Sequence, residues 1–403
     1  MSRKEQDQYF EENPGSRKKR RHGAGKTVLI ILFVFLLISG GGIYLIHHYM
    51  DLIPRIDPRR QSTLSPSEAQ ELINRETESA PSATAGPSSN AAVREVTVDP
   101  NESYVVEING ETKVVSGSEV NANPDYNVVG QFEWKKAEPL ADKDLINVML
   151  LGIDARKTGD QTRTDTMILI SVNPKSHEIA MISFMRDLYL PIHEGYEDSR
   201  LNHAYEIGGL DFLYDCLENN FGLHIDGSVV VDFKQFAKII DILGGVDITL
   251  TAKEAEHLKD NVIDFTGNTT TSPSSLHEGS CHLDGNTALA YCRIRKIDDD
   301  FHRTARQRNV LTALFGKVKS AGIRELNEIL NTVIAMSATD LSNSDILSYA
   351  ASVLPYLGSA SLESGRIPCD GSYRSVYINS MSVVQAVQQS NLDYLKSVLP
   401  FGN

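Results

Sequence analysis

Cysteine is scarce in this chain, and the common motifs of hydrolytic sites are missing from it. The 403 residues contain four cysteines and no CxxC pair, which argues against a cysteine-bound zinc. No HExxH and no GxSxG motif occurs, so a zinc hydrolase or a serine hydrolase has little support. The GAGKT stretch at 23–27 lacks the full spacing of a phosphate-binding loop and the strand that precedes one.

Positive charge is also scarce once the first 26 residues are set aside. The whole chain has a net charge of −14, and residues 1–26 carry eight Lys and Arg against four Asp and Glu, which is +4. The remainder therefore carries −14 − 4 = −18. Such an acidic region does not suit general binding to nucleic acid, and any basic cluster inside it stands out.

A single long apolar run lies near the N-terminus. Residues 27–46 are twenty uncharged residues, long enough to span a bilayer as a helix and longer than the core of a usual signal peptide. The flank before this run is basic and the flank after it has no Lys or Arg before Arg55, so the positive-inside rule places residues 1–26 in the cytoplasm. We therefore predict a single-pass protein of the cell membrane with its folded part outside. The basic residues are Arg17, Lys18, Lys19, Arg20, Arg21 and Lys26.

The predicted extracellular part divides into a spacer, a small β region and one large domain. Residues 47–92 include a Ser-, Ala- and Pro-rich stretch that has too few apolar groups to order itself, which indicates a flexible linker. Within 93–140, YVVEINGETKVV has an Asn-Gly pair between two apolar runs and predicts a hairpin. Residues 141–403 alternate helix and strand patterns, as an α/β domain requires. Its cysteines can form disulfides outside the cell, and the sequence does not choose among the pairings of Cys216, Cys281, Cys292 and Cys369.

A group of charged residues lies at the predicted ends of three strands. Short apolar runs predict strands at 147–153, 166–172 and 178–185. If these form an antiparallel meander, the end of the first, the start of the second and the end of the third share one edge of a sheet. Carboxylates there suit Mg²⁺ and guanidiniums suit a polyphosphate, although single charges at strand ends commonly just face water. The four residues are Asp154, Arg163, Asp165 and Arg186.

Residues 283–315 hold a second group of basic residues. The pattern AYCRIR predicts a strand with Arg293 and Arg295 on one face. The helix expected after it places Arg303, Arg306 and Gln307 on one side. In an acidic domain these arginines favour a phosphate or other polyanion site over a merely solvated face. The polar stretch 251–280 predicts a long surface loop that could cover such a site.

Two weaker signals have simple structural interpretations. Asp298–Asp300 resembles the acidic clusters with which nucleotide-sugar glycosyltransferases hold a metal, but a run of three Asp is more typical of a solvated turn or a helix start. His203 could touch a substrate, yet a structural role is the simpler reading.

The two charged groups together resemble the LytR-CpsA-Psr family of bacterial cell-envelope proteins, over roughly residues 144–315. The resemblance implies a three-layer α/β/α sandwich around a mixed, largely antiparallel sheet. It also implies an enzyme that transfers a phosphate-linked glycopolymer, such as teichoic acid or capsule, from a polyprenyl pyrophosphate lipid to peptidoglycan, with Mg²⁺ or Mn²⁺ as cofactor. The motifs that carry it are NVMLLGIDAR with RTDTMILISVNP, SFMRDLYLPI, SRLNHAYEIGG, LGGVDI, and LDGNTALAYCRIR followed by DFHRTARQRNVL.

The resemblance also implies roles for individual residues. Asp154 and Asp165 are expected to hold the metal, and Arg163 and Arg186 to be catalytic. The sequence identifies no general base, and Asp187 is a candidate only because it is adjacent to Arg186. The chain departs from the family pattern at Thr164, usually Ser, and at Arg200, usually Lys; both changes keep the chemical type. The expected pyrophosphate ligands are Arg163, Arg186, Arg293, Arg295, Arg303, Arg306 and Gln307.

Other functions remain open from the sequence. A polyprenyl pyrophosphate pyrophosphatase would use the same cation and arginines with water as the acceptor. A non-enzymatic membrane-bound regulator is less favoured, because the 26 residues before the apolar run are too few for a helix-turn-helix domain. A lipid substrate further predicts a groove lined with Val, Ile, Leu and Phe beside the charged edge.

Overall fold

The structure is a computed structural model, and it describes the chain in segments. No helix of the described residues is long and apolar enough to cross a membrane. The predicted cytoplasmic tail, the apolar run 27–46 and Asp154 lie outside the described residues, so the membrane anchor stays a prediction. The described segments are 54–56, 63–79, 103–108, 111–123, 127–130, 134–140, 144–153, 163–267, 269–320, 337–353, 355–378 and 381–401.

The predicted meander forms the middle of a mixed six-stranded sheet. Antiparallel pairing joins β4 to β5 and β5 to β6, whereas β9 runs parallel to β4 and β13 runs parallel to β6. A short strand, β12, closes the β9 edge in antiparallel pairing. The strand order is β12 (Ala338–Thr339), β9 (Gly227–Asp232), β4 (Ile146–Ile153), β5 (Thr164–Asn173), β6 (Glu178–Phe184) and β13 (Ser361–Ile367).

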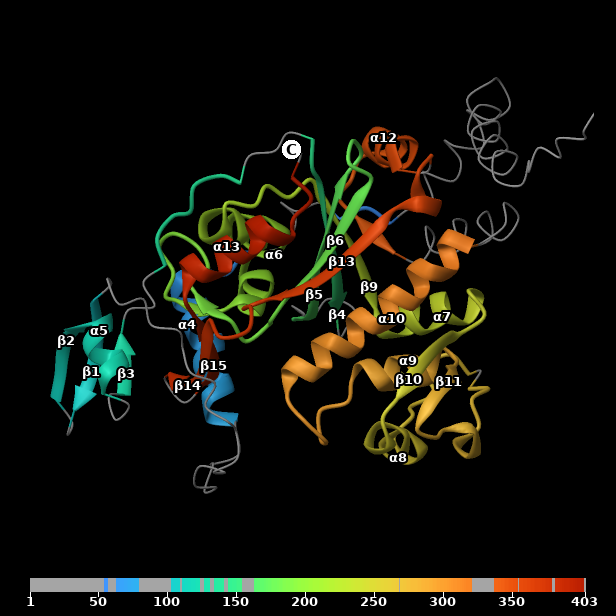
Figure 1. Cartoon of the computed structure of the whole chain (residues 1–403), viewed down its shortest axis with the longest axis horizontal. Helices are drawn as coiled ribbons and strands as arrows, with labels where there is room; N and C mark the ends of the chain where they lie inside the picture. The colour runs from blue at the N-terminus through green and yellow to red at the C-terminus, as the bar shows by residue number, and fades with distance from the viewer. Residues whose placement is uncertain are drawn as a thin grey trace, which may run out of the picture. The chain divides into compact units, whose positions relative to one another are not determined.

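Helices cover both faces of this sheet, which confirms the predicted α/β architecture. In Figure 1, α6 (Leu201–Phe221) and α13 (Gln388–Val398) lie on one side. On the other side lie α7 (Phe233–Ile242), α9 (Gly285–Cys292) and α10 (Asp300–Ser320).

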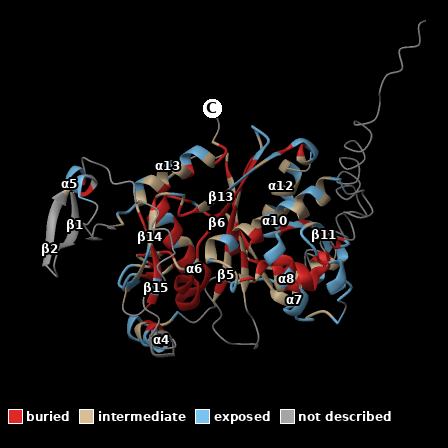
Figure 2. Ribbon diagram, turned by 60° about the horizontal axis from the view of Figure 1, so that its bottom comes forward, coloured by how far each residue is buried: buried red, intermediate tan, exposed pale blue. Residues whose placement is uncertain are grey.

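Strand alternation decides which side chains meet which helices. Leu151 pairs with Met167 across β4 and β5, and both side chains belong to the buried core that includes α6. Figure 2 shows this core in red around α6. The neighbouring pair, Leu150 and Ile168, points to the opposite face because successive side chains of a strand alternate. That face is the one covered by α7, α9 and α10.

A second, smaller core forms beside these helices. It is built on the two-stranded sheet of β10 (Val246–Leu250) and β11 (Gly279–Leu283) together with α8 (Ala252–Asp260). The prediction of a surface loop over 251–280 was therefore wrong for the residues of α8. This helix begins with a capping box between Thr251 and Glu254, a signal that the Ser- and Thr-rich composition of the stretch obscured.

The prediction of a strand over AYCRIR was also wrong. Residues Gly285–Cys292 form α9, because the Asp284 side chain accepts a hydrogen bond from the Thr287 backbone N–H and so caps a helix N-terminus. Arg293 is the C-cap residue of this helix. Arg293 and Arg295 are consequently placed by a helix end and the turn after it.

Part of the predicted flexible linker is ordered. Residues 66–79 form α4 (Pro66–Ser79), in which Ala69 and Ile73, four residues apart, are buried in the main core. Leu64 N–H donates to Ile207 O at 3.0 Å, and Arg55 bridges to Thr339 at the sheet edge. The linker prediction overlooked Ala69 and Ile73. Their spacing places both on one face of a helix, and that is enough to pack α4 against the main core.

The small β region contains the predicted hairpin. Strands β1 (Ser103–Ile108) and β2 (Glu111–Ser116), which flank the Asn-Gly pair in the sequence, pair antiparallel, and β3 (Asn127–Gly130) pairs with β1. A short helix, α5 (Gly117–Ala122), follows β2.

The main domain begins slightly before residue 141. Residues 134–140 pack along the end of α6, where Leu140 N–H donates to Gly222 O at 2.8 Å. Gly222 has a φ of +69°, and a Cβ there would lie 2.1 Å from Glu138 O. Both the end of α6 and the packing of residues 134–140 against it therefore require a glycine at position 222.

The C-terminal region adds both strands and helices to the domain. It supplies strand β13 to the main sheet and a hairpin of β14 (Tyr373–Ile378) and β15 (Met381–Ala386), besides α12 (Asn343–Val353) and α13. Val384 N–H of the hairpin donates to Asp187 O at 2.8 Å, which fixes it against β7 (Tyr189–Leu190) and β8 (Ser199–Arg200). All four cysteines are free thiols.

Candidate active site

The charged edge has the geometry that the meander predicts. Ile153 pairs with Thr164 and Met167 pairs with Phe184, so the end of β4, the start of β5 and the end of β6 lie together. Gly152 pairs with Thr166 and Ile153 with Thr164, which leaves Asp165 as the extra residue of a β-bulge. A bulge re-aims the side chain of the extra residue, and here that side chain is a predicted metal ligand.

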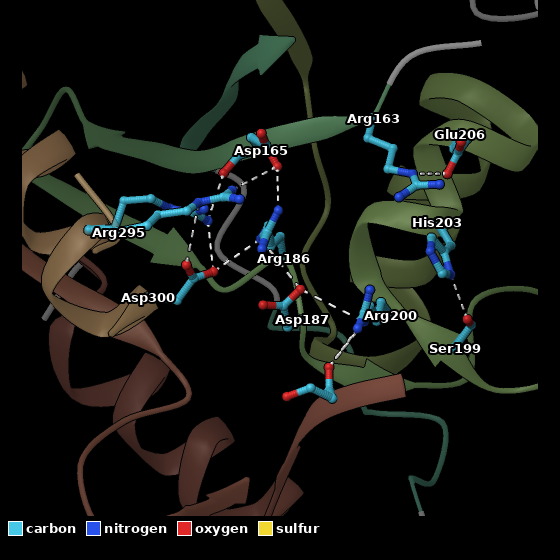
Figure 3. A network of polar contacts seen from close by, with 12 residues as sticks. Arg163, Asp165, Arg186, Asp187, Ser199, Arg200, His203, Glu206, Arg295 and Asp300 are labelled. Atoms are coloured by element: carbon cyan, nitrogen blue, oxygen red, sulfur yellow. Dashed lines mark hydrogen bonds and ion pairs between the residues drawn. The ribbon is translucent and has the colours of Figure 1, made fainter. Parts of the chain in front are cut away.

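Arg186 stands at the centre of a connected charged network (Figure 3). Its Nη1 donates to Asp165 Oδ1 at 2.7 Å, and its Nε donates to Asp300 Oδ2 at 3.0 Å. Arg295 Nη2 lies 3.5 Å from the same Asp165 oxygen, and Arg303 Nη2 lies 2.9 Å from Asp300 Oδ2. We call these five residues the guanidinium cluster.

The cluster keeps its two carboxylates ionised. Burial alone would raise the pKa of Asp165, but Arg186, Arg295 and Arg303 outweigh it and hold that pKa below its ordinary value. The pKa of Asp300 is lowered in the same way, with Arg303 and Arg186 as the main opposing charges to burial. Asp187, beside the cluster, behaves differently, because burial and the neighbouring Asp300 raise its pKa above the ordinary value.

Arg303 is a buried cation whose hydrogen-bonding capacity is largely unused. Its residue is 2 % exposed, yet Nε and Nη1 have no hydrogen-bond partner among the described residues. Burial and the nearby Arg186 lower the pKa of Arg303 to about 10. Gln307, one helical turn further along α10, has an unpartnered Oε1 within the same described part of the chain. Leaving buried polar groups unpaired is costly, so these atoms point to a ligand that completes them.

An apolar cavity of about 400 Å³ opens beside the guanidinium cluster, and it confirms the predicted groove. Arg293 stands at its polar end with its guanidinium carbon 4.3 Å from the centre of the Phe233 ring. We call this space the lipid cavity. Its apolar walls include Leu150, Ile168, Val229, Val231, Phe236, Ile239, Leu289, Leu311 and Leu314, and its polar end is formed by Asp165, Asp232, Arg293, Arg295, Arg303 and Gln307.

Three of the predicted pyrophosphate ligands do not line this cavity, namely Arg163, Arg186 and Arg306. Of these, Arg186 belongs to the guanidinium cluster beside the cavity. Arg163 Nε lies 2.6 Å from Glu206 Oε2 on α6, apart from the guanidinium cluster (Figure 3). Arg306 is buried behind the cavity, where its Nε donates to Glu254 Oε1 at 2.6 Å and its terminal nitrogens bond Asp298. The guanidinium of Arg306 thus has structural partners, and it is not part of the phosphate site that we propose below.

Sequence reasoning undervalued Asp300 and Arg200. Asp300 orients both Arg186 and Arg303, and its position three residues before Arg303 on one helix was a readable signal. Arg200 lies 3.8 Å from Asp187 Oδ1 and donates to the Ser382 carbonyl at 2.8 Å, a contact that no local pattern reveals. The structural interpretation of His203 is confirmed, since it is fully buried and hydrogen-bonded to Ser199 Oγ at 2.7 Å.

An apolar cavity that ends at a cluster of guanidiniums defines a protein that binds an amphiphilic anion, with an apolar tail and a phosphate-like head group. The chain belongs to the LytR_cpsA_psr family, whose model matches residues 104–398. The family resemblance of the sequence motifs is thereby confirmed.

Named relatives act on teichoic acid. The chain is 34% identical over 257 residues to the polyisoprenyl-teichoic acid–peptidoglycan teichoic acid transferase TagT of Bacillus subtilis (strain 168), covering 62% of this chain and 70% of the relative. It is 29% identical over 278 residues to the corresponding transferase TagU of Bacillus mycoides (strain KBAB4), covering 68% and 84%. A solved structure described as TagT bound to LIIa-WTA superposes with a TM-score of 0.51 at 26% identity, covering 66% of this chain and 94% of that one.

Proposed function

We propose that this protein is a membrane-anchored phosphotransferase that attaches a phosphate-linked glycopolymer from a polyprenyl pyrophosphate lipid to peptidoglycan. The observation that carries the proposal is the buried, partly unpartnered Arg303 at the polar end of the lipid cavity. The names of the TagT and TagU relatives support the same donor and acceptor.

The two halves of the donor match the two parts of the site. The polyprenyl tail occupies the lipid cavity, where Leu, Ile, Val and Phe side chains remove it from water. The diphosphate lies at Arg303, Arg295 and Arg293, whose guanidiniums bind phosphate oxygens in a planar, charge-assisted manner. Binding the anion supplies the missing partners of Arg303, so the head group and the protein stabilise each other.

The chemistry of the donor set suits Mg²⁺. Asp165 is an ionised carboxylate that lines the lipid cavity, and Asp154 directly follows the last residue of β4 in the sequence. Mg²⁺ is characteristically bound by one or two carboxylates plus substrate phosphates and water rather than by a full protein cage. In this proposal Asp154 and Asp165 hold the ion, which neutralises phosphate charge when bound.

The chain's own residues position the phosphate and stabilise its charge. Phosphoryl transfer requires little covalent chemistry from the protein, so orientation and electrostatics dominate catalysis. Arg186 is held from two sides by Asp165 and Asp300, which fixes its guanidinium before substrate arrives. Asp187 is our candidate base, because its raised pKa makes its carboxylate a stronger proton acceptor than an ordinary Asp.

A reconstituted transfer reaction tests this function. Purified full-length protein in detergent is given a synthetic polyprenyl diphosphate that carries a disaccharide, together with peptidoglycan fragments. Mass spectrometry should find a new phosphodiester between disaccharide and fragment, and Arg186→Ala should lower its rate about 100- to 1,000-fold. Arg75→Ala, on the exposed face of α4, is the matched control.

The product distinguishes the alternatives. Release of the disaccharide phosphate into water with no phosphodiester would favour a pyrophosphatase over a transferase. Equal rates for Arg186→Ala and the wild-type protein would reject the site itself.

A further inference from the structure

A second cavity, of about 320 Å³, lies against the guanidinium cluster. In the described part of the chain it shares no lining residue with the lipid cavity. Ion pairs nevertheless join the two walls directly, because Arg186 of the second cavity bonds Asp165 of the first, and Asp300 of the second bonds Arg303 of the first. Arg186 and Asp300 therefore form the partition between the two spaces. We call the second space the hairpin cavity, and its lining is Met185, Arg186, Asp187, Arg200, Asp299, Asp300, Phe301, Ser375, Ser382, Val383 and Val384.

Hydroxyl and charged groups dominate the hairpin cavity, unlike the apolar walls of its neighbour. Ser375 and Ser382 enter from the β14–β15 hairpin, and Arg200 donates to the Ser382 carbonyl at 2.8 Å and so ties that hairpin to the charged edge. Val384 N–H donates to Asp187 O at 2.8 Å, a second tie at the same place. Neutral, hydroxyl-rich molecules such as sugars match this mixture of donors and acceptors. A polyprenyl chain does not match it.

The direction of phosphoryl transfer supplies the next step. The attacking and leaving oxygens must lie roughly in line on opposite sides of the phosphorus. If the lipid leaves toward the lipid cavity, the attacking hydroxyl has to come from the side that faces away from it. Arg186 is the partition residue, so a phosphate held by its guanidinium has the hairpin cavity on that other side.

We propose that the hairpin cavity binds the acceptor, a sugar unit of a peptidoglycan strand, and presents one of its hydroxyls to the phosphate at Arg186. The proposal rests on the proposed function and adds the acceptor's binding site to it. The acceptor oxygen forms a bond to the phosphorus that carries the polymer, and the bond from that phosphorus to the bridging oxygen breaks. The electron pair leaves with polyprenyl phosphate, while the hydroxyl proton passes to the Asp187 carboxylate and then to water.

Asp187 is placed for this proton transfer by contacts from several elements. Its Oδ1 lies 3.4 Å from Arg186 Nε and 3.8 Å from Arg200 Nε, and its carboxylate lines the hairpin cavity. The charged groups around it are Arg186, Arg200 of β8 and Asp300 of α10. The two arginines hold the carboxylate, which lines the hairpin cavity and not the lipid cavity.

The test blocks the hairpin cavity without touching the charged residues. Ser375→Trp fills it from an exposed position of β14, and Ser382→Trp repeats the block from β15. Tyr377→Trp on β14, which is 73% exposed and does not line the cavity, is the matched control. The full-length protein is assayed with the disaccharide-bearing polyprenyl diphosphate as donor and a soluble peptidoglycan tetrasaccharide as acceptor. Acceptor KM, donor KM and hydrolysis without acceptor are measured.

The proposal predicts a selective defect. Both cavity-blocking variants should raise the acceptor KM roughly tenfold or more, and leave the donor KM unchanged, which also shows that they are folded. Tyr377→Trp should leave all three quantities unchanged. Asp187→Asn should lower kcat for transfer about 100-fold or more, with little change in acceptor KM.

Each other result overturns a distinct statement. An unchanged acceptor KM in both blocking variants rejects the hairpin cavity as the acceptor site. A raised donor KM assigns the cavity to the donor's polymer instead. If the wild-type protein hydrolyses the donor and forms no phosphodiester at all, the proposed function fails rather than the location of the acceptor.

Discussion

Arg303 and Arg306 lie three residues apart on α10, and both are almost fully buried, at 2 % and 3 % exposed. Arg306 bonds Glu254, Asp298 and the Ile294 carbonyl, so its guanidinium is fully engaged. Arg303 bonds Asp300 and leaves two nitrogens unpartnered among the described residues. The same residue type on the same helix is thus satisfied by the protein in one case and left incomplete in the other.

The difference separates a structural arginine from a binding arginine. A buried charge that keeps its partners contributes to a specific fold, whereas a buried charge without partners lowers stability until a ligand supplies them. Proximity to the charged edge does not make this distinction, since both arginines belong to one sequence motif. The hydrogen-bond partners make this distinction, and one of them, Glu254, comes from an element far away in the chain.

The largest expected effect divides the two arginines by stability. Arg306→Ala should lower the free energy of unfolding by about 3 to 5 kcal/mol, because it leaves the buried Glu254 and the half-buried Asp298 without their opposing charge. Arg303→Ala should lower it far less, yet slow transfer about 100- to 1,000-fold. Urea denaturation measures the first quantity and the reconstituted transfer assay the second. Equal losses of stability in the two variants would remove the distinction between them.

Low pH should reveal the contribution to stability of a third buried side chain, His203, which is hydrogen-bonded in its neutral form. Burial lowers the pKa of His203 to about 4, whereas the unfolded chain retains the ordinary value near 6.5. Between these values the unfolded state binds more protons, so the stabilising contribution is complete above about pH 6.5 and is lost as pH falls toward 4, amounting to about 3 kcal/mol.

The control for this pH effect is an exposed histidine. Denaturation between pH 7 and 4 should show a shallower loss of stability in His203→Asn than in the wild-type protein. His224→Asn, whose side chain is 78% exposed, should leave the slope unchanged. A wild-type slope in His203→Asn would mean that other groups cause the acid sensitivity.

Bound pyrophosphate should supply Arg303 with the partners that Arg306 already has, and so stabilise the folded protein. Inorganic pyrophosphate at about 100 times its Kd should raise the unfolding free energy by about 2.7 kcal/mol, because it binds only the folded protein. Arg303→Met should abolish most of this stabilisation, while Arg75→Ala should retain it. Thermal denaturation with and without pyrophosphate gives the shift. An undiminished shift in Arg303→Met would place the anion elsewhere.

The sequence predicted the charged edge because its geometry is local. The neighbouring strands β5 and β6, joined by residues 174–177, bring Asp165 and Arg186 together, and only the pairing of neighbours is needed to deduce this. The apolar cavity could also be predicted, because a lipid substrate requires an apolar groove. Asp154 completes the predicted set in the sequence, and its role as a metal ligand stays a prediction.

The rest depended on contacts that are distant in sequence. The partner of Arg306, Glu254, lies 52 positions away on α8, so helical spacing could not tell this arginine from Arg303. The hairpin cavity needs residues near 187 and near 384 at one place, and the C-terminal strands β14 and β15 carry no motif that predicts it. The β-bulge at Asp165 likewise follows from register, which a single strand does not reveal.

The smallest expected effect concerns the carboxylates at the start of α10. Asp300 orients Arg186 and Arg303, so Asp300→Asn, which keeps the shape and removes the charge, should slow transfer about tenfold, or about 1.4 kcal/mol of barrier. Asp299 also lines the hairpin cavity, but its side chain is 58% exposed and bonds His302 rather than an arginine side chain. Asp299→Asn keeps the shape of that side chain and should therefore retain transfer within about twofold. Initial rates of the reconstituted reaction compare the two. A loss in Asp299→Asn as large as in Asp300→Asn would instead support a metal site on Asp298–Asp300, the glycosyltransferase-like alternative. Unequal losses in the predicted direction would show that an aspartate at this helix start matters only through the arginines that it holds.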